Sequence, residues 1–312
     1  MSLSRTFSMI FLLSLFLLMS ASSSAAQDTL PHYPDDVQAT TVDGREIAFV
    51  DRGDGEPLLF VHGLGSNLSF WRETLDVFDD SHRVLALDLP GYGLSEKEDV
   101  PGTMPFFADI VTAFLDERGV DKVTYIGVSM GGQVGLTLAL ESPDRLRRLA
   151  LVSPAGIEQF STKEAAALND GTTAEGIMNS TDEQVKKNTA LNFASWSDEY
   201  AWIIEQRHAL SKRSDFEAYA KANARSVAGM LEGAVRDQLG EIEVPTLVLF
   251  GAGDRLIPNQ YLHADMTTKD VANRAKEALP NATVQMVDEA GHLLMLERPT
   301  VFQNELRAFV TE

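Results

Sequence analysis

The chain has 312 residues, of which 44% are hydrophobic, so it can bury a full core and is neither a disordered tail nor a fibre. Its formal net charge of −20 argues against a nucleic-acid partner, because phosphate binding needs a basic surface. The sequence contains no cysteine, which excludes disulfides and the attachment of a lipid through a cysteine. We therefore expect the fold to be held by its packed core alone.

The N-terminal residues have the three parts of a secretory signal peptide. Arg5 precedes an apolar block at residues 9–19, and Ser24 and Ala26 occupy the small-residue positions before a cleavage site. The pattern predicts a signal peptide over residues 1–26 and an exported protein, either periplasmic or secreted. The alternative is an uncleaved membrane anchor, for which the block is shorter than the roughly 20 residues of a membrane span. No later segment is apolar enough to cross a bilayer, so no stable membrane span is expected after cleavage.

The next part of the chain is rich in strand patterns. Residues 37–42 and 45–53 are predicted to be strands, and residues 54–56 are predicted to form the turn between the second of them and the next strand. Residues 57–63 form a nearly unbroken apolar run, which is typical of a strand covered on both faces. A helix is predicted around residues 70–78, and a further buried strand over residues 83–91, which ends in a loop of glycine and proline.

Strands and helices then alternate. Residues 104–118 carry apolar side chains at helical spacing. A strand is predicted over residues 122–128, a helix over residues 131–141 and another strand over residues 146–154. This alternation indicates a parallel sheet with helices on both faces.

The alternation stops at residues 155–235, where alanine-rich and charge-rich helical patterns replace the strands. It resumes with strands at residues 245–254 and 282–288 and helices at residues 259–279 and 299–310.

We therefore predict a single core domain built from residues 27–154 and 236–312. Residues 155–235 are predicted to form a helical cap, or lid, inserted over one end of the sheet.

One serine lies between glycines at a strand-to-helix junction. Residues 127–131 have the pattern Gly-x-Ser-x-Gly, with Ser129 at the centre. A sharp turn there exposes the hydroxyl and strains the serine backbone, so the flanking residues must be small. The following helix start offers free N–H groups to a developing oxyanion. Ser129 is thus a candidate nucleophile.

A serine nucleophile needs a base, and the base needs a carboxylate to orient it. His292 follows the last predicted strand and Asp254 follows the one before, so both lie at the same sheet edge as Ser129. Asp288 is a competing acid at the start of the His292 loop. The chain order Ser129, Asp254, His292 favours Asp254 as the acid.

The oxyanion also needs a second N–H donor. The glycine-rich segment at residues 60–67, which follows an early strand, places the Leu64 N–H where it can pair with the Met130 N–H. His62, in the same loop, is expected to fix the loop by hydrogen bonds rather than to carry protons.

These motifs resemble the α/β-hydrolase superfamily. The matching segments run in the order of that family and cover nearly the whole chain after the predicted signal peptide; they are residues 62–65, 88–95, 127–132, 251–254 and 291–299. The resemblance implies an α/β fold with a mostly parallel eight-stranded sheet, helices on both faces and an inserted helical cap. It also implies Ser129, Asp254 and His292 as the triad, and Leu64 and Met130 as oxyanion donors.

Within the superfamily, the chain looks most like lipases and esterases of the monoacylglycerol-lipase kind. The resemblance implies a carboxylesterase or lipase that acts on a small-molecule ester or lipid through an acyl-enzyme, with no cofactor and no metal. Lactonases, amidases and carbon–carbon bond hydrolases share the triad and stay open as alternatives. A hydrolase-fold binding protein without catalysis is a further alternative. The sequence predicts no oligomeric state.

The helical insertion is expected to shape the substrate pocket. Phe193, Trp196 and Met230 are the candidate substrate-binding residues, with Tyr200, Trp202 and Phe216 as further candidates. The alternative for each of them is that it packs the insertion onto the sheet.

Overall fold

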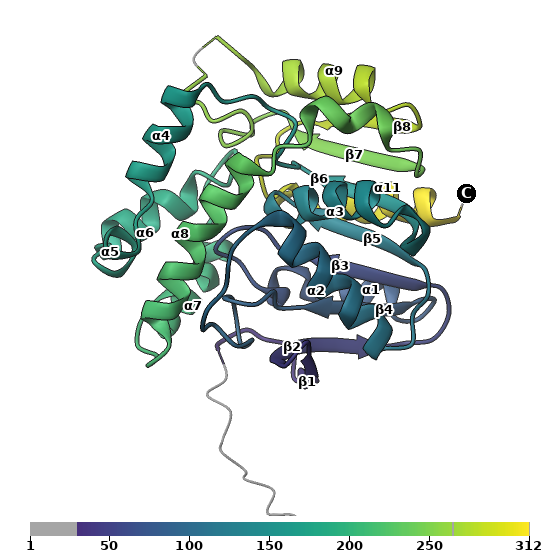
Figure 1. The fold of residues 1–312 in the computed structure, drawn as a ribbon, viewed down its shortest axis with the longest axis horizontal. Helices are drawn as coiled ribbons and strands as arrows, with labels where there is room; N and C mark the ends of the chain where they lie inside the picture. Colours follow the sequence, from purple (N-terminus) through teal and green to yellow (C-terminus); the bar gives the residue numbers. More distant parts are fainter. Residues whose placement is uncertain (1–29, 264, 312) are drawn as a thin grey trace, which may run out of the picture.

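The computed structural model describes residues 30–263 and 265–311 (Figure 1). The predicted signal peptide, residues 1–26, lies outside the described residues. Among the described residues, no helix is both long enough and apolar enough to cross a membrane.

An eight-stranded sheet forms the centre of the molecule, with the strand order β1-β2-β4-β3-β5-β6-β7-β8. The first two pairings, β1 with β2 and β2 with β4, are antiparallel, and all others are parallel. The predicted mostly parallel sheet of eight strands is confirmed. The strands are β1 (Gln38–Val42), β2 (Arg45–Arg52), β3 (Pro57–Val61), β4 (Arg83–Leu87), β5 (Val123–Val128), β6 (Leu146–Val152), β7 (Thr246–Gly251) and β8 (Ala282–Val287).

Helices cover both faces of the sheet. Successive residues of a strand point to opposite faces, so each central strand contacts helices on both sides. Leu59 and Val61 of β3 pack on the side of α2 (Met104–Glu117), α3 (Met130–Glu141) and α9 (Thr268–Ala278). Leu58 and Phe60 pack on the side of α1 (Arg72–Phe78) and α11 (Pro299–Thr311). Both faces are therefore apolar, which explains the unbroken apolar runs in the central strands.

The helix predicted over residues 259–279 is shorter in the structure. It begins only at Thr268, because the Thr267 hydroxyl accepts the Asp270 N–H and the Asp270 carboxylate accepts the Thr267 N–H. Turns occupy residues 256–262 instead, and the buried His263 follows them, so it does not lie on the predicted helix.

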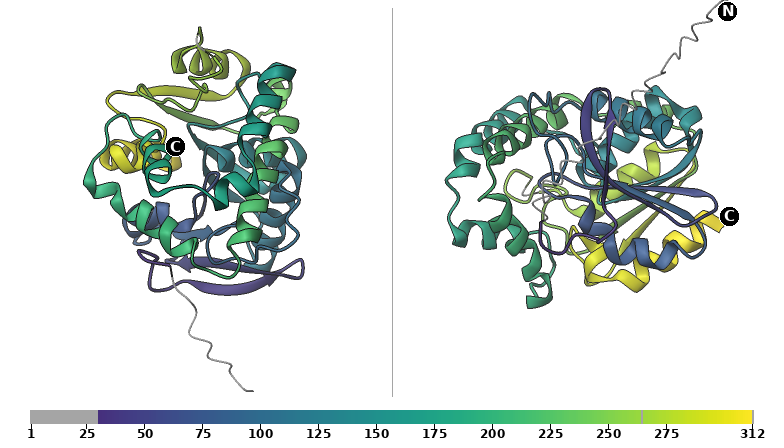
Figure 2. Two further views of the ribbon diagram at one scale, coloured as in Figure 1. Left: turned by 90° about the vertical axis from the view of Figure 1, so that its left-hand side faces the viewer. Right: turned by 90° about the horizontal axis from the view of Figure 1, so that it is seen from below.

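The segment between β6 and β7 is helical, and the structure has no strand in residues 155–235. Figure 2 shows its helices grouped at one end of the sheet. They are α4 (Thr162–Gly171), α5 (Ala174–Met178), α6 (Asp182–Ala190), α7 (Ala201–Leu210) and α8 (Phe216–Glu232). We call residues 155–235 the helical insertion. The remaining α-helix, α10 (Leu294–Glu297), precedes α11.

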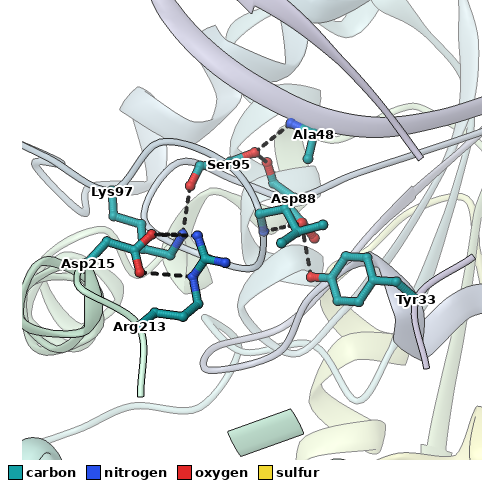
Figure 3. Close-up of polar contacts among 8 residues, drawn as sticks. Tyr33, Ala48, Asp88, Ser95, Lys97, Arg213 and Asp215 are labelled. Carbon is teal, nitrogen blue, oxygen red and sulfur yellow. Dashed lines mark hydrogen bonds and ion pairs between the residues drawn. The ribbon is translucent and has the colours of Figure 1, made fainter. Parts of the chain in front are cut away.

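A buried ion pair ties the helical insertion to the core (Figure 3). The Lys97 ammonium lies 2.9 Å from Asp215, just before α8, and donates to the Ser95 carbonyl oxygen at 2.9 Å. Arg213 also donates to Asp215, at 3.0 Å. The Lys97 side chain is only 1% exposed and that of Asp215 is 29% exposed. The charge of Lys97 is therefore stabilised mainly by its protein partners, whereas the charge of Asp215 is also stabilised by solvent.

The loop that carries Lys97 is itself held by buried hydrogen bonds (Figure 3). The Ser95 hydroxyl donates to the Asp88 carbonyl oxygen at 2.7 Å and accepts the Ala48 N–H at 2.8 Å. The Asp88 carboxylate accepts the Tyr33 hydroxyl at 3.0 Å and the Leu94 N–H at 2.7 Å. The loop is therefore a rigid anchor for the start of α8.

Because Lys97 is buried and Asp215 is partly exposed, replacing Asp215 should lower the free energy of unfolding more than replacing Lys97. Asp215→Ala leaves a buried ammonium without its carboxylate and should lower the free energy of unfolding by roughly 3 kcal/mol. Lys97→Met leaves Asp215 paired with Arg213 and should cost only about 1 kcal/mol. Urea denaturation measures both. The double variant should be more stable than Asp215→Ala alone, and equal costs for the two single variants would contradict the interpretation.

Candidate active site

Ser129 lies at the turn between β5 and α3 with φ 55° and ψ −117°, a backbone conformation that is unfavourable for any residue except glycine. Three backbone hydrogen bonds hold it there. Its N–H donates to the Val152 carbonyl oxygen at 2.9 Å, and its carbonyl oxygen accepts the N–H groups of Gln133 and Ala155. The side chain is half-buried. The surrounding structure therefore fixes the backbone of Ser129 and the direction in which its side chain leaves the turn.

Two glycines make room for this turn. A Cβ atom at Gly127 would lie 2.4 Å from the Gly131 carbonyl oxygen, and a Cβ atom at Gly131 would lie 2.5 Å from the carbonyl oxygens of both Val61 and His62. These are backbone atoms, which cannot move aside as a side-chain end can. Any larger residue at either position would push α3 away from the sheet.

His292 and Asp254 meet at this end of the sheet. His292 Nδ1 lies 2.9 Å from Asp254 Oδ2, and the two side chains are 4% and 0% exposed. The other carboxylate oxygen accepts the N–H groups of Leu256 at 2.8 Å and Ile257 at 3.1 Å. Asp288, the competing acid, is exposed. With Nδ1 donating to Asp254, the second ring nitrogen of His292 is free to exchange a proton with a neighbouring group.

Ser129 and His292 both line one cavity of about 330 Å³, which we call the nucleophile cavity. The structure thus brings together the three residues that the sequence predicts as a triad. Most of the cavity wall is apolar, and the loop after β6 and helices α4 and α8 contribute part of it. An apolar wall excludes water and strengthens electrostatic interactions inside the cavity.

The two predicted oxyanion donors lie in the residue that follows Ser129 and in the loop after β3. Met130 is the first residue of α3, and Leu64 lines the cavity. Neither N–H has a hydrogen-bond acceptor in the part of the chain that the structure describes. Two backbone N–H groups without partners at a helix start and a nearby loop can hold a developing negative charge.

His62 fixes the Leu64 loop. Its Nε2 accepts the Leu89 N–H at 3.0 Å, which places the proton on Nδ1, and this nitrogen donates to the Gly63 carbonyl oxygen at 2.8 Å. Burial lowers the pKa of His62 to about 4. His62 is therefore a neutral cross-link between two loops, as the sequence suggests.

Glu297 is a positioning residue that sequence reasoning missed. Its carboxylate accepts the N–H of Gly291, next to His292, and the N–H of Ala194 in the helical insertion at 2.9 Å. Arg255, next to Asp254, donates to the Ala194 carbonyl oxygen at 2.8 Å. One short segment of the insertion thus contacts the loops of both the acid and the base. The only sequence signal was the position of Glu297 within the motif at residues 291–299.

The three predicted substrate-binding residues lie in different surroundings. Met230 on α8 lines the nucleophile cavity. Phe193 is fully buried and stacks on Tyr200 with ring centroids 4.1 Å apart, and Trp196 packs edge-on against Phe193. Neither Phe193 nor Trp196 is among the residues that line this cavity. Both pack the insertion against the core instead.

A buried carboxyl group in the cavity wall was not anticipated as a site residue. Glu158, on the loop after β6, is 5% exposed and lines the nucleophile cavity. Its Oε2 accepts the Asn259 N–H at 3.2 Å. Burial, and to a lesser degree the charge of Asp254, raises the pKa of Glu158 to about 8. At neutral pH this side chain is mostly an uncharged acid.

A second cavity of about 330 Å³ adjoins the first and shares Leu64, Thr172 and Asn192 with it. Arg207 on α7 lines this second cavity, with its guanidinium 4.7 Å from the centre of the Tyr219 ring. Within the described residues, no carboxylate lies within 4 Å of Arg207, and no cluster of three or more acidic, histidine or cysteine side chains is placed to hold a metal.

Comparison with known proteins gives one family. The sequence profile of a family described as alpha/beta hydrolase fold matches residues 56–299. The chain is 29% identical to a dihydrolipoyllysine-residue acetyltransferase component of an acetoin cleaving system from Cupriavidus necator, over 86% of this chain and 68% of that protein. It is 27% identical to 3-oxoadipate enol-lactonase 2 from Acinetobacter baylyi, over 89% of this chain and 96% of the lactonase.

Solved structures show the same fold. The crystal structure of a probable hydrolytic enzyme from Pseudomonas aeruginosa superposes with a TM-score of 0.78 at 24% identity, covering 89% of this chain and 94% of the other. At this level of identity the likeness supports the fold alone.

The crowded turn predicts that Gly131→Ala is severely destabilising. Its Cβ would need to displace two backbone carbonyl groups at the end of β3, so we expect the free energy of unfolding to fall by more than about 3 kcal/mol. Thermal and urea denaturation measure the loss. Gly171→Ala in α4, where a Cβ meets no atom within 4 Å, is the control and should be neutral. A folded Gly131→Ala protein of normal stability would contradict the crowding argument.

Proposed function

Because the chain belongs to the α/β-hydrolase family, we propose that it is a serine hydrolase that cleaves carboxylic esters through an acyl-enzyme. One observation carries this proposal. A serine in a strained backbone conformation shares a cavity with a histidine whose Nδ1 is held 2.9 Å from a buried aspartate. That arrangement activates a hydroxyl toward a carbonyl carbon and has no equivalent purpose in packing.

The reaction follows from the roles of these groups. His292 Nε2 takes the proton of the Ser129 hydroxyl while the oxygen attacks the carbonyl carbon of the ester. The N–H groups of Leu64 and Met130 hold the oxyanion of the tetrahedral intermediate. His292 then returns the proton to the leaving alcohol. A water molecule, activated by His292, attacks the acyl-enzyme and releases the acid. Asp254 stabilises the imidazolium in both halves of the reaction.

We propose that the helical insertion, residues 155–235, acts as the cap of this site and that the core consists of residues 27–154 and 236–312. Helices α4 and α8 contribute Leu168, Val227 and Met230 to the wall of the nucleophile cavity. This apolar wall suits the hydrocarbon part of an ester or lipid, including a monoacylglycerol.

A lactonase is the second candidate, supported by the relative that is named an enol-lactonase. A lactone is a cyclic ester, so the same serine, histidine and N–H donors would open it without change. Carbon–carbon bond hydrolysis and amide hydrolysis use the same groups. Comparing turnover of a lactone with that of an open-chain ester of equal carbon number distinguishes the first two activities.

We also propose that the protein is exported, with residues 1–26 removed as a signal peptide. The support is the order of Arg5, the apolar block at residues 9–19 and the small residues Ser24 and Ala26. The intact mass of the protein isolated from a secreting host tests this proposal. A mature chain that begins at Gln27 is expected, whereas a chain retaining residues 9–19 in the membrane fraction would contradict it.

The triad assignment predicts graded losses of esterase activity. Ser129→Ala should abolish turnover of p-nitrophenyl butyrate, because the bond to the acyl group cannot form. Asp254→Asn should lower kcat by roughly four orders of magnitude, since His292 loses the partner that fixes its tautomer. Steady-state kinetics measure both, with Asp288→Asn as the matched control that keeps full activity. Substantial activity in the Ser129→Ala variant would rule out the mechanism.

A further inference from the structure

The Glu158 carboxyl group is the one acidic side chain that lines the nucleophile cavity among the described residues. It sits on the loop that follows β6, and the same cavity holds Ser129 and His292. Oε2 is occupied, because it accepts the Asn259 N–H at 3.2 Å. Oε1 has no hydrogen-bond partner among the described residues. This oxygen is therefore available to a molecule bound in the cavity.

Among the described residues that line the cavity, no lysine or arginine balances this carboxyl group. The nucleophile cavity has no lysine or arginine in its described wall, and its only histidine, His292, is bound to Asp254. His263 Nε2 lies 3.9 Å from Glu158 Oε2, which is too far for a hydrogen bond, and its other ring nitrogen lies 3.8 Å from Glu164. The titratable groups that face Glu158 are thus Asp254, His263, Glu164 and His292.

An anionic substrate group in this cavity would meet the Glu158 carboxyl group and no lysine or arginine of the described wall. A substrate carboxylate would lie in a mostly apolar space beside Glu158, and the charge of Asp254 also acts on this side chain. Burial of an unpaired charge is costly, and a like charge nearby adds to that cost. An uncharged ester, ether or hydroxyl oxygen carries neither cost and can accept a hydrogen bond from a protonated carboxyl group.

We propose that Glu158 is a specificity-determining residue: when protonated it donates a hydrogen bond from Oε1 to an uncharged oxygen of the substrate, and when ionised it repels a substrate carboxylate from the nucleophile cavity. The inference rests on the proposed esterase function and names the substrate class of that site. The substrates are neutral esters. Ester hydrolysis itself needs no proton from Glu158.

The proposed role of Glu158 predicts a change in substrate preference when Glu158 loses its proton. The pKa of Glu158 is raised to about 8, so the side chain is an uncharged donor at pH 7 and mostly a carboxylate at pH 9. Across that interval an anionic substrate should become a poorer substrate relative to a neutral one, and a cationic substrate a better one. Arg207 in the second cavity stays charged, because its pKa is lowered only to about 10.

The experiment compares three ethyl esters of similar size at pH 7 and pH 9: ethyl pentanoate, monoethyl glutarate and ethyl 4-(trimethylammonio)butyrate. Release of ethanol measures kcat/KM for each. In the wild-type protein, the ratio for the anionic ester over the neutral ester should fall roughly tenfold between pH 7 and pH 9, and the ratio for the cationic ester should rise. Dividing by the neutral ester removes the pH dependence of the triad.

Two substitutions of Glu158 test whether this residue causes the change of the ratios with pH. In Glu158→Gln both ratios should stay within about twofold across the pH interval, because the amide cannot ionise. Glu158→Met serves the same purpose if the glutamine variant fails to fold. Glu164→Gln, on the far side of His263, is the matched control and should keep the wild-type trend.

The outcomes are distinguishable. Ratios that do not change with pH in the wild-type protein, or a trend that persists in both Glu158 variants, would overturn the role of Glu158 while leaving the esterase function intact. Failure of the folded wild-type protein to hydrolyse any of the three esters would contradict the proposed function, and this inference with it.

Discussion

The site depends on one backbone constraint, the positive φ angle of Ser129 at the turn between β5 and α3. The surrounding structure enforces this conformation through three backbone hydrogen bonds and through two glycines whose missing side chains let α3 approach β3. The same close approach places the first N–H of α3 beside the Leu64 loop. The strained residue and the position of the N–H donor at the start of α3 are therefore consequences of one packing arrangement.

The helical insertion is part of this arrangement as well as a wall of the cavity. Through Ala194 it is hydrogen-bonded to Glu297 and Arg255, which adjoin the loops of the base and the acid. Lys97 and Asp215 tie its far end to the core. The insertion is therefore in direct contact with residues next to the loops that carry Asp254 and His292.

The eight strands could be predicted from the sequence, because each is a short run of apolar or alternating residues bounded by turn residues. It was also sufficient to propose Ser129, Asp254 and His292, since parallel strands end at one edge and loops there must meet. The helix predicted over residues 259–279 is too long, because the capping box of Thr267 and Asp270 begins the helix at Thr268. The surroundings of Phe193 and Glu158 could not be predicted from the sequence. Whether an aromatic ring or a carboxyl group faces a cavity depends on contacts between residues far apart in the chain.

The most direct test of the account is to ask which atom of the protein forms the covalent intermediate. The folded protein is treated with a fluorophosphonate, which reacts with activated serine hydroxyl groups, and the adduct is located by peptide mass spectrometry. The account predicts one stoichiometric adduct on Ser129, formed much more slowly in a His292→Ala variant. Labelling of a different residue, or no labelling of the native protein at all, would contradict the claim that this turn activates Ser129.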